Sequence, residues 1–371
     1  MRAAASPRHA AAALALALAL TGCAPDPCLD AVCVVAEDLA QGLLSVRAPA
    51  DDDVWVVGSS PAPDAAEGAP GPLAARWDGA GWTALDTSDW DGLELWWAHV
   101  TADEAVLVGT RGTILEYDRA SGALEQVVDA GQGAVFFGVW GANPDDLWAV
   151  GQGVERPDAD GDGEPEPALP LLWRRQGGVW AAWEDPTFGP GEPNAIWFKV
   201  HGRSADDLWI VGSGGTALHW DGTALAATPT DAETDTSTAP LLTVDAGGER
   251  PYAVGGAGAG LILEWDGAQW RDASPEFQSS YNGVCTGPDG AAAAVGRSGG
   301  RALALDGAWS PDQDRGVESV TFRDFHACTY SPGGALWAVG GRIGSRPLGM
   351  GIVTYTGPGT IQPLTATPEG S

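Results

Sequence analysis

One short motif recurs along the chain and limits what it can fold into. The segment Asp145-Asp146-Leu147-Trp148-Ala149-Val150-Gly151 has close copies at 206–212 and 52–58, and four weaker copies also end in Val-Gly. The seven glycines are Gly58, Gly109, Gly151, Gly212, Gly255, Gly296 and Gly340. Successive glycines are 51, 42, 61, 43, 41 and 44 residues apart. A period near 42, with two lengthened units, is typical of a repeat fold in which each unit is one small sheet.

Each repeat unit is predicted to contain four strands. In the clearest unit they lie at 134–140, 147–150, 169–175 and 179–183. Gly177-Gly178 joins the last two as a hairpin, and Asp78-Gly79 and Asp266-Gly267 mark the same hairpin in other units, because glycine accepts positive φ without steric cost. Seven such units without a helical period predict an all-β fold, a seven-bladed β-propeller of four-stranded antiparallel blades.

The unit resembles the Asp-box (BNR-type) propellers, a class that includes sialidase-like and photosystem-assembly-factor propellers. The resemblance rests on Val-Gly, a glycine loop, and then Trp-Asp-Gly leading to a second Trp, and it covers about 42–367. The chain departs from the Asp-box because Arg76, His219 and Glu264 stand where the box has serine, and because the aspartate directly precedes the glycine. The resemblance therefore implies the propeller architecture and no particular subfamily.

The N-terminus carries a targeting signal. Arg2 and Arg8 precede an apolar stretch of 11 residues, Ala10 to Leu20, which is too short to span a bilayer. Leu20-Thr21-Gly22-Cys23 resembles the bacterial lipobox, which implies cleavage before Cys23 and acylation of that cysteine; the alternative is an ordinary signal peptide with a chance cysteine. We therefore expect a signal peptide at 1–22, a lipidated cysteine and tether at 23–41, and the propeller at 42–371.

The predicted location follows from the same segment. Ala24, and no aspartate, follows Cys23, so no inner-membrane retention signal is present. We expect a lipid-anchored protein of the cell envelope, at the outer membrane or cell surface of a Gram-negative bacterium. The net charge of −31, with Lys199 as the single lysine, argues against binding to nucleic acid or to anionic lipid. Contact with the membrane is therefore expected through the N-terminal lipid only.

Four cysteines remain beside Cys23, an even number in an oxidising compartment. Cys28 and Cys33 are close in sequence, whereas Cys285 and Cys328 lie 43 residues apart, at similar places in neighbouring units. We predict the disulfides Cys28–Cys33 and Cys285–Cys328; the alternative is free buried thiols. The way the ring closes stays open, because the first and last units both look complete. Either a strand near 28–35 joins the last blade, or the ring closes by packing alone.

Loop length distinguishes the two faces of the predicted propeller. The connections between strands 2 and 3 and between blades open on one face and are long and irregular, whereas the turns on the other face are short. Ligand sites on a rigid scaffold usually lie on such loops. Seven aromatic residues without a fixed blade position are the candidates for this ligand face: Trp90, Trp96, Trp97, Phe188, Trp197, Phe277 and Phe325. The alternative is that they pack between blades.

The insertion that lengthens one repeat to 61 residues is acidic. Asp158, Asp160 and Asp162 alternate with other residues, as at the start of EF-hand-type and thrombospondin-type calcium loops, and Glu164 and Glu166 follow. Oxygen ligands at this spacing can converge on Ca²⁺. The position of the EF-hand's bidentate glutamate is Leu169, for which Glu166 is the substitute. The alternative is a solvated acidic loop held open by its own charge.

No catalytic motif stands out. The acid pairs, such as Asp145 and Asp146, recur by blade at one turn, which indicates a structural role, and the histidines lack metal-ligand spacing. We therefore expect a non-catalytic binding or scaffold module for a protein or a glycan. Two alternatives stay open: a propeller glycan hydrolase, which would need an Arg and carboxylate cluster at the channel mouth, and a structural component of an envelope assembly.

Overall fold

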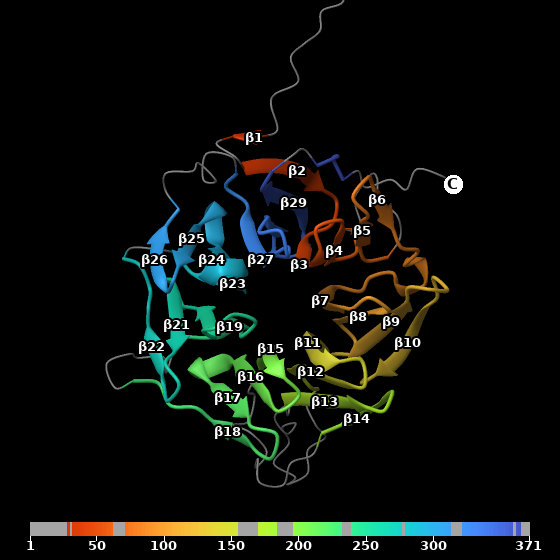
Figure 1. Ribbon diagram of the computed structural model, residues 1–371. Coiled ribbons are helices and arrows are strands. Elements are labelled where there is room, and N and C mark those ends of the chain that lie inside the picture. The colour runs from red at the N-terminus through yellow and green to blue at the C-terminus, as the bar shows by residue number, and fades with distance from the viewer. Residues whose placement is uncertain are drawn as a thin grey trace, which may run out of the picture.

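The protein is described from a computed structural model that covers residues 28–29, 32–61, 71–154, 170–183, 196–231, 239–276, 279–312, 321–358 and 361–364. Seven antiparallel sheets are arranged in a ring (Figure 1). The described helical residues are four short 3₁₀ turns, η1 (Ser88–Trp90), η2 (Ser213–Gly215), η3 (Pro288–Gly290) and η4 (Arg297–Gly299). The predicted all-β, seven-bladed propeller is confirmed.

Six blades are built from four consecutive strands each, in order from the channel outward. The first three are β3 (Leu43–Ala50), β4 (Asp53–Gly58), β5 (Ala74–Trp77) and β6 (Trp82–Ala84); β7 (Leu95–Val100), β8 (Glu104–Gly109), β9 (Thr113–Asp118) and β10 (Leu124–Asp129); and β11 (Val135–Asn143), β12 (Asp146–Gln152), β13 (Pro170–Gln176) and β14 (Val179–Ala182). The next three are β15 (Trp197–Ser204), β16 (Asp207–Gly212), β17 (Ala217–Trp220) and β18 (Leu225–Ala227); β19 (Leu241–Asp245), β20 (Tyr252–Gly255), β21 (Leu261–Trp265) and β22 (Trp270–Asp272); and β23 (Tyr281–Thr286), β24 (Ala291–Gly296), β25 (Arg301–Leu305) and β26 (Ala308–Pro311).

The seventh blade joins the two ends of the chain. Its inner strands are β27 (Asp324–Tyr330), β28 (Leu336–Arg342) and β29 (Gly349–Thr356), and β2 (Val32–Leu39) pairs with β29 as the next strand outward. The two-residue β1 (Cys28–Leu29) lies outside β2 at the perimeter (Figure 1). The ring therefore closes through an N-terminal strand, one of the two closures that the sequence leaves open. The propeller also begins before residue 42, because part of the segment expected to be a tether supplies β2.

The Trp of the repeated motif lies on the second strand of its blade and is buried in the core of the propeller. Trp55, Trp148, Trp209 and Trp337 are among the largest fully buried side chains. Around Trp148, the rings of Trp183 and Trp220 have centroids 5.0 and 5.5 Å away, so aromatic contacts join the third blade to the fourth. The abundance of tryptophan therefore serves blade packing first.

The repeated acid pairs form ion pairs between strands. The second acid of three motifs binds a basic residue on the third strand, at the positions where the Asp-box has serine: Asp53 accepts from Arg76 Nε at 2.6 Å, Asp146 accepts from Arg174 Nε at 2.6 Å, and Asp207 lies 2.7 Å from His219 Nε2. In the fifth blade the acid and the base change places: the third strand supplies the acid, Glu264, which accepts from Arg250 just before the second strand. The structural role expected of the acid pairs is thus, for the second acid, to link the second and third strands by an ion pair.

No helix among the described residues has the length and apolar character needed to cross a membrane.

Candidate functional site: the central channel

A bulge in every inner strand shapes the wall of the channel. In all seven blades the pairing between the first and second strands skips one residue, immediately after the residue that faces the Val-Gly glycine. The skipped residues are Leu44, Trp96, Phe137, Phe198, Leu242, Asn282 and His326, and we call them the bulge ring. A bulge redirects one side chain away from the strand's normal alternation. All but Leu44 line a cavity at one end of the channel.

The Val-Gly glycines make this bulge possible. A Cβ at any of the seven would overlap the carbonyl oxygen of the residue that precedes its partner on the inner strand, as at Gly151 with Val135 and at Gly340 with Asp324. The most repeated residue of the sequence is therefore required for a close approach of two backbones. It is not required for a positive φ, since none of the seven glycines has one.

The bulge ring forms the wall of a cavity of about 470 Å³. Its rim includes Thr110 and Arg297, which follow second strands, and Gln152, which is the last residue of one. It therefore opens on the face of the long loops, and we call it the long-loop cavity. The rings of Trp96 and Phe137 pack edge to face at 5.0 Å, and those of Phe137 and Phe198 lie 5.6 Å apart. Edge-to-face packing fixes these rings, so the cavity wall is both apolar and preformed.

Charged groups stand at the rim of the long-loop cavity. Arg346 donates to Glu94, with Nη2 and Oε2 2.9 Å apart, and the Asp324 carboxylate accepts from the Ser298 N–H at 2.8 Å. Arg297 is exposed at the rim and forms no ion pair with the described residues. The rim therefore carries both a basic and an acidic side chain, Arg297 and Asp324, on a chain with a net charge of −31.

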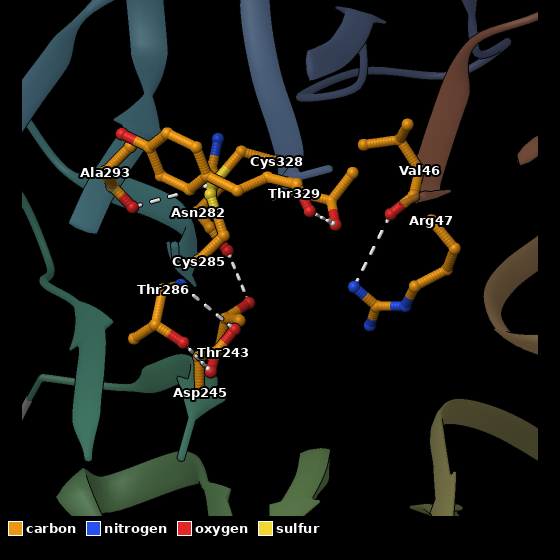
Figure 2. Close-up of a disulfide and its surroundings, with 11 residues drawn as sticks. Val46, Arg47, Thr243, Asp245, Asn282, Cys285, Thr286, Ala293, Cys328 and Thr329 are labelled. Atoms are coloured by element: carbon orange, nitrogen blue, oxygen red, sulfur yellow. Dashed lines mark hydrogen bonds between the residues drawn. A yellow bond between two sulfur atoms is a disulfide. The ribbon is translucent and has the colours of Figure 1, made fainter. Parts of the chain in front are cut away.

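The opposite end of the channel holds a second cavity of about 470 Å³, the short-turn cavity, lined by polar residues from the ends of the inner strands. Arg47, His99, His201 and Asp245 face it. Asp245 accepts from Thr286 Oγ1 and from the Gly247 N–H, both at 2.8 Å, and Figure 2 shows Arg47 extending from β3 into the channel. The Arg47 Nε donates to the Ala98 carbonyl at 3.0 Å, and burial lowers the pKa of Arg47 to about 10.

One indole contacts a cationic side chain from each of the two cavities. The Arg47 guanidinium and the Lys199 Nζ each lie 4.2 Å from the centroid of the Trp97 ring. Lys199 lines the long-loop cavity and Arg47 the short-turn cavity, so Trp97 contacts one cationic side chain from each cavity. The Lys199 Nζ also donates to the Phe137 carbonyl at 2.8 Å. Burial, and then the nearby Arg47, lowers the pKa of Lys199 well below its ordinary value.

The channel histidines are held neutral. His326 Nδ1 lies 2.5 Å from the Leu44 carbonyl, which can only accept, so Nδ1 carries the proton and Nε2 remains an acceptor. His201 Nδ1 accepts from the Ala246 N–H at 3.0 Å, which leaves the proton on Nε2. Burial lowers the pKa of His99 and of His326 to about 3, with Arg47 adding to the shift at His99 and Lys199 at His326. Among the described residues, no group of three or more His, Cys, Asp or Glu could hold a metal ion.

The aromatic residues proposed from the sequence divide into three groups. Trp96 lines the long-loop cavity, and Trp90 is half-buried and packs against the core of the second blade. Trp97, Trp197 and Phe325 are 3%, 4% and 0% exposed, so for these three the alternative of packing within the propeller holds. Phe188 and Phe277 lie outside the described residues.

The remaining predicted sites fall partly outside the described residues. Cys23 and the acidic segment 158–166 are both outside. Cys285 and Cys328 form the predicted disulfide, which links the inner strands β23 and β27 with a Cα–Cα distance of 5.7 Å (Figure 2). Cys28 is the register partner of Cys33 across β1 and β2, and Cys33 is disulfide-bonded.

Sequence reasoning does not identify Phe137, Phe198, His326 or Lys199 as residues of a ligand site. A usable signal was present in the doublets Trp96-Trp97, Phe136-Phe137 and Trp197-Phe198. Neighbouring side chains of a regular strand face opposite sides. Two large apolar residues in succession at the start of an inner strand therefore place one of them toward the channel.

No protein-family model matches the chain, and no curated protein sequence matches it. Solved structures do resemble it. YCF48 bound to D1 peptide has a TM-score of 0.58 at 15% identity, over 88% of this chain and 96% of that one. U3-55K has a TM-score of 0.59 at 10% identity, over 88% of this chain and 98% of that one. The extracellular domain of a putative one-component system from B. thetaiotaomicron has a TM-score of 0.56 at 13% identity, over 86% of this chain and 38% of that one. At these identities the likeness shows the fold alone, and the chain is a β-propeller.

Proposed function

We propose that this protein is a lipid-anchored, non-catalytic binding module of the cell envelope, which holds a segment of a partner protein at the long-loop mouth of its channel. The observation that carries the proposal is the bulge ring, since six of its seven residues line one mainly apolar, preformed cavity on the face of the variable loops. Deep apolar cavities with a few polar groups are the usual form of ligand sites. The propeller of YCF48, similar in fold, has been solved bound to a peptide.

The proposed anchor is compatible with this ligand site. Lipid on Cys23 would attach the chain a few residues before Cys28. Cys28 lies on the outermost strand of the seventh blade, at the perimeter of the ring (Figure 1). Attachment at the perimeter leaves the long-loop mouth accessible. The outer membrane or cell surface of a Gram-negative bacterium, and kinship with Asp-box propellers, remain part of the proposal.

A protein ligand is favoured over a glycan by the chemistry of the wall. The rings of Trp96, Phe137 and Phe198 and the side chain of Leu242 suit apolar side chains. The glycan-hydrolase alternative required Arg and carboxylate groups at the mouth. Among the described residues there, Arg346 is engaged with Glu94, which leaves one arginine, Arg297, and one carboxylate, Asp324.

The test compares the two ends of the channel. The lipid-free protein, immobilised, is exposed to envelope extract, beside the variants Phe198→Glu in the long-loop cavity and Trp140→Glu in the short-turn cavity. Both side chains are half-buried and face a cavity. We expect a protein that wild type and Trp140→Glu retain equally and that Phe198→Glu loses. Equal retention by all three proteins would refute the proposed face.

We also propose that the acidic segment Asp158, Asp160, Asp162, Glu164 and Glu166 binds Ca²⁺ weakly, with a Kd of roughly 10⁻⁴ to 10⁻³ M as in extracellular modules. The insertion that contains it joins β12 to β13, and Gln152 at the end of β12 lines the rim of the long-loop cavity. An ordered calcium loop would therefore stand beside the ligand. Calorimetry with Ca²⁺ should give binding heat for wild type and none for Asp160→Ala; no heat for wild type at millimolar calcium ends the idea.

A further inference from the structure

Lys199 is the only lysine in 371 residues, and the fold places it inside the channel. It lies on the inner strand β15, directly after the bulge residue Phe198, and is 3% exposed. Its amine lies over the Trp97 ring and donates to one acceptor, the Phe137 carbonyl. A surface as acidic as this one could have balanced a lysine anywhere on the exterior, so its position in the channel requires an explanation.

The amine lacks a counter-ion among the described residues. An ammonium carries three donors, and Lys199 uses one of them on a carbonyl. The charged neighbour that affects it is the cationic Arg47 on β3, and His326 on β27, which Lys199 affects in turn, is neutral. A buried cation without a partner is costly, and a ligand that brings a carboxylate would relieve that cost.

The space in front of the amine is closed at one end. Six residues of the bulge ring surround it, and no residue that lines it also lines the short-turn cavity. A blind cavity admits the end of a chain more readily than its middle, because an internal segment would have to enter and leave through the same mouth. The rim carries both the Arg297 guanidinium and the Asp324 carboxylate, so the preference for an acidic ligand rests on Lys199.

We propose that the long-loop cavity receives the carboxyl end of a peptide chain, with the terminal carboxylate paired to Lys199 and the last side chain, an apolar one, packed against Phe137 and Phe198. The proposal rests on the proposed function and names the part of the partner that is bound. His326 Nε2 is available to accept an N–H of the same peptide. Lys199 is then the specificity-determining residue, since it distinguishes a chain end from an internal segment.

The test uses acetylated tripeptides that cover all residues except cysteine at each position, prepared once as free acids and once as C-terminal amides. We expect wild type to prefer free acids with an apolar last residue by about tenfold or more, the size of a charge-assisted hydrogen bond. Lys199→Met, which keeps the length and apolar character of the stem, should bind acids and amides equally. The control Arg203→Met, on the same strand but outside this cavity, should keep the preference.

The outcomes separate this inference from the proposed function. If amides bind as well as acids, or if internal Asp or Glu replaces the chain end in amidated peptides, the inference is wrong and peptide binding stands. If neither form binds, both are wrong. A second measurement needs no variant: selective ¹³Cε labelling of lysine gives one signal, from Lys199. The best free acid should raise the pKa of Lys199 by about one unit or more, because an opposite charge favours the protonated form; an unchanged pKa in saturating peptide overturns the inference.

Discussion

Gly151 faces Val135 so closely that a Cβ on the glycine would overlap the Val135 carbonyl oxygen and stand 2.8 Å from the Cα of Phe136. The same contact recurs at all seven Val-Gly glycines. It explains why a residue without a side chain marks the period of this sequence. The backbones approach where the inner strand bulges, and the bulge directs the next residue into the channel.

Gly151→Ala should therefore destabilise the protein by roughly 3 kcal/mol, because a rigid backbone on both sides leaves no room to repack. Urea unfolding measures the change. The matched control is Gly258→Ala, where a Cβ meets nothing within 4 Å and the residue is exposed, and it should unfold near the wild-type midpoint. Equal midpoints for the two variants would show that the close approach does not constrain the fold.

The disulfide between Cys285 and Cys328 should stabilise the junction of the sixth and seventh blades. It closes a 43-residue loop, which the chain-entropy model values at about 4 kcal/mol. The double variant Cys285→Ala/Cys328→Ala should therefore unfold at lower urea than wild type, without reductant. Superimposable unfolding curves would mean that this bridge constrains the unfolded chain little.

Acid should destabilise the propeller through its buried histidines. The folded pKa of His99 and His326 is about 3, against an ordinary value of 6.5, so the unfolded chain takes up protons first as the pH falls. Their contribution to stability is complete above pH 6.5 and is lost as the pH falls from 6.5 to 3. For each histidine the loss is roughly 1.4 kcal/mol for every unit by which folding lowers its pKa. His99→Phe should flatten the pH dependence of the free energy of unfolding in that window. A slope parallel to that of wild type would contradict the assignment.

The anchor is tested by cell fractionation. Cys23→Ala should release the protein from the membrane fraction, because no other membrane attachment is expected and acylation requires the cysteine thiol. Its normal fold can be verified by the urea midpoint of the released protein. If the variant still sediments with membranes as wild type does, the lipoprotein interpretation fails.

The architecture could be predicted from the sequence because the fold is repetitive, and the same strand and turn motifs recur in most repeats. The Val-Gly period predicted seven blades, and Asp78-Gly79 predicted a hairpin in which Gly79 has a φ of 90°. Ring closure was ambiguous, since β2 pairs with β29, which is more than 300 residues away in sequence, and no local rule sets that pairing.

The site was harder to predict, because a bulge exchanges the faces of a strand. Period-two alternation cannot tell which member of Trp96-Trp97 faces the cavity, and the answer depends on the skipped pairing with the second strand. Trp97, Trp197 and Phe325 were for this reason assigned to the ligand face although they are buried. Lys199 was noticed for its rarity, but its burial follows from packing between blades, which composition does not reveal.

The most direct test of the central claim, that a partner protein binds at the long-loop mouth, is photocrosslinking in living cells. A photoreactive phenylalanine analogue is placed at Gln152, on the rim of the long-loop cavity, or at Pro332, which is exposed beside the short-turn cavity. We predict a covalent protein adduct from position 152 and none from position 332, with the crosslink mapping near the carboxyl end of the partner. An adduct from position 332 and none from position 152 would contradict the account.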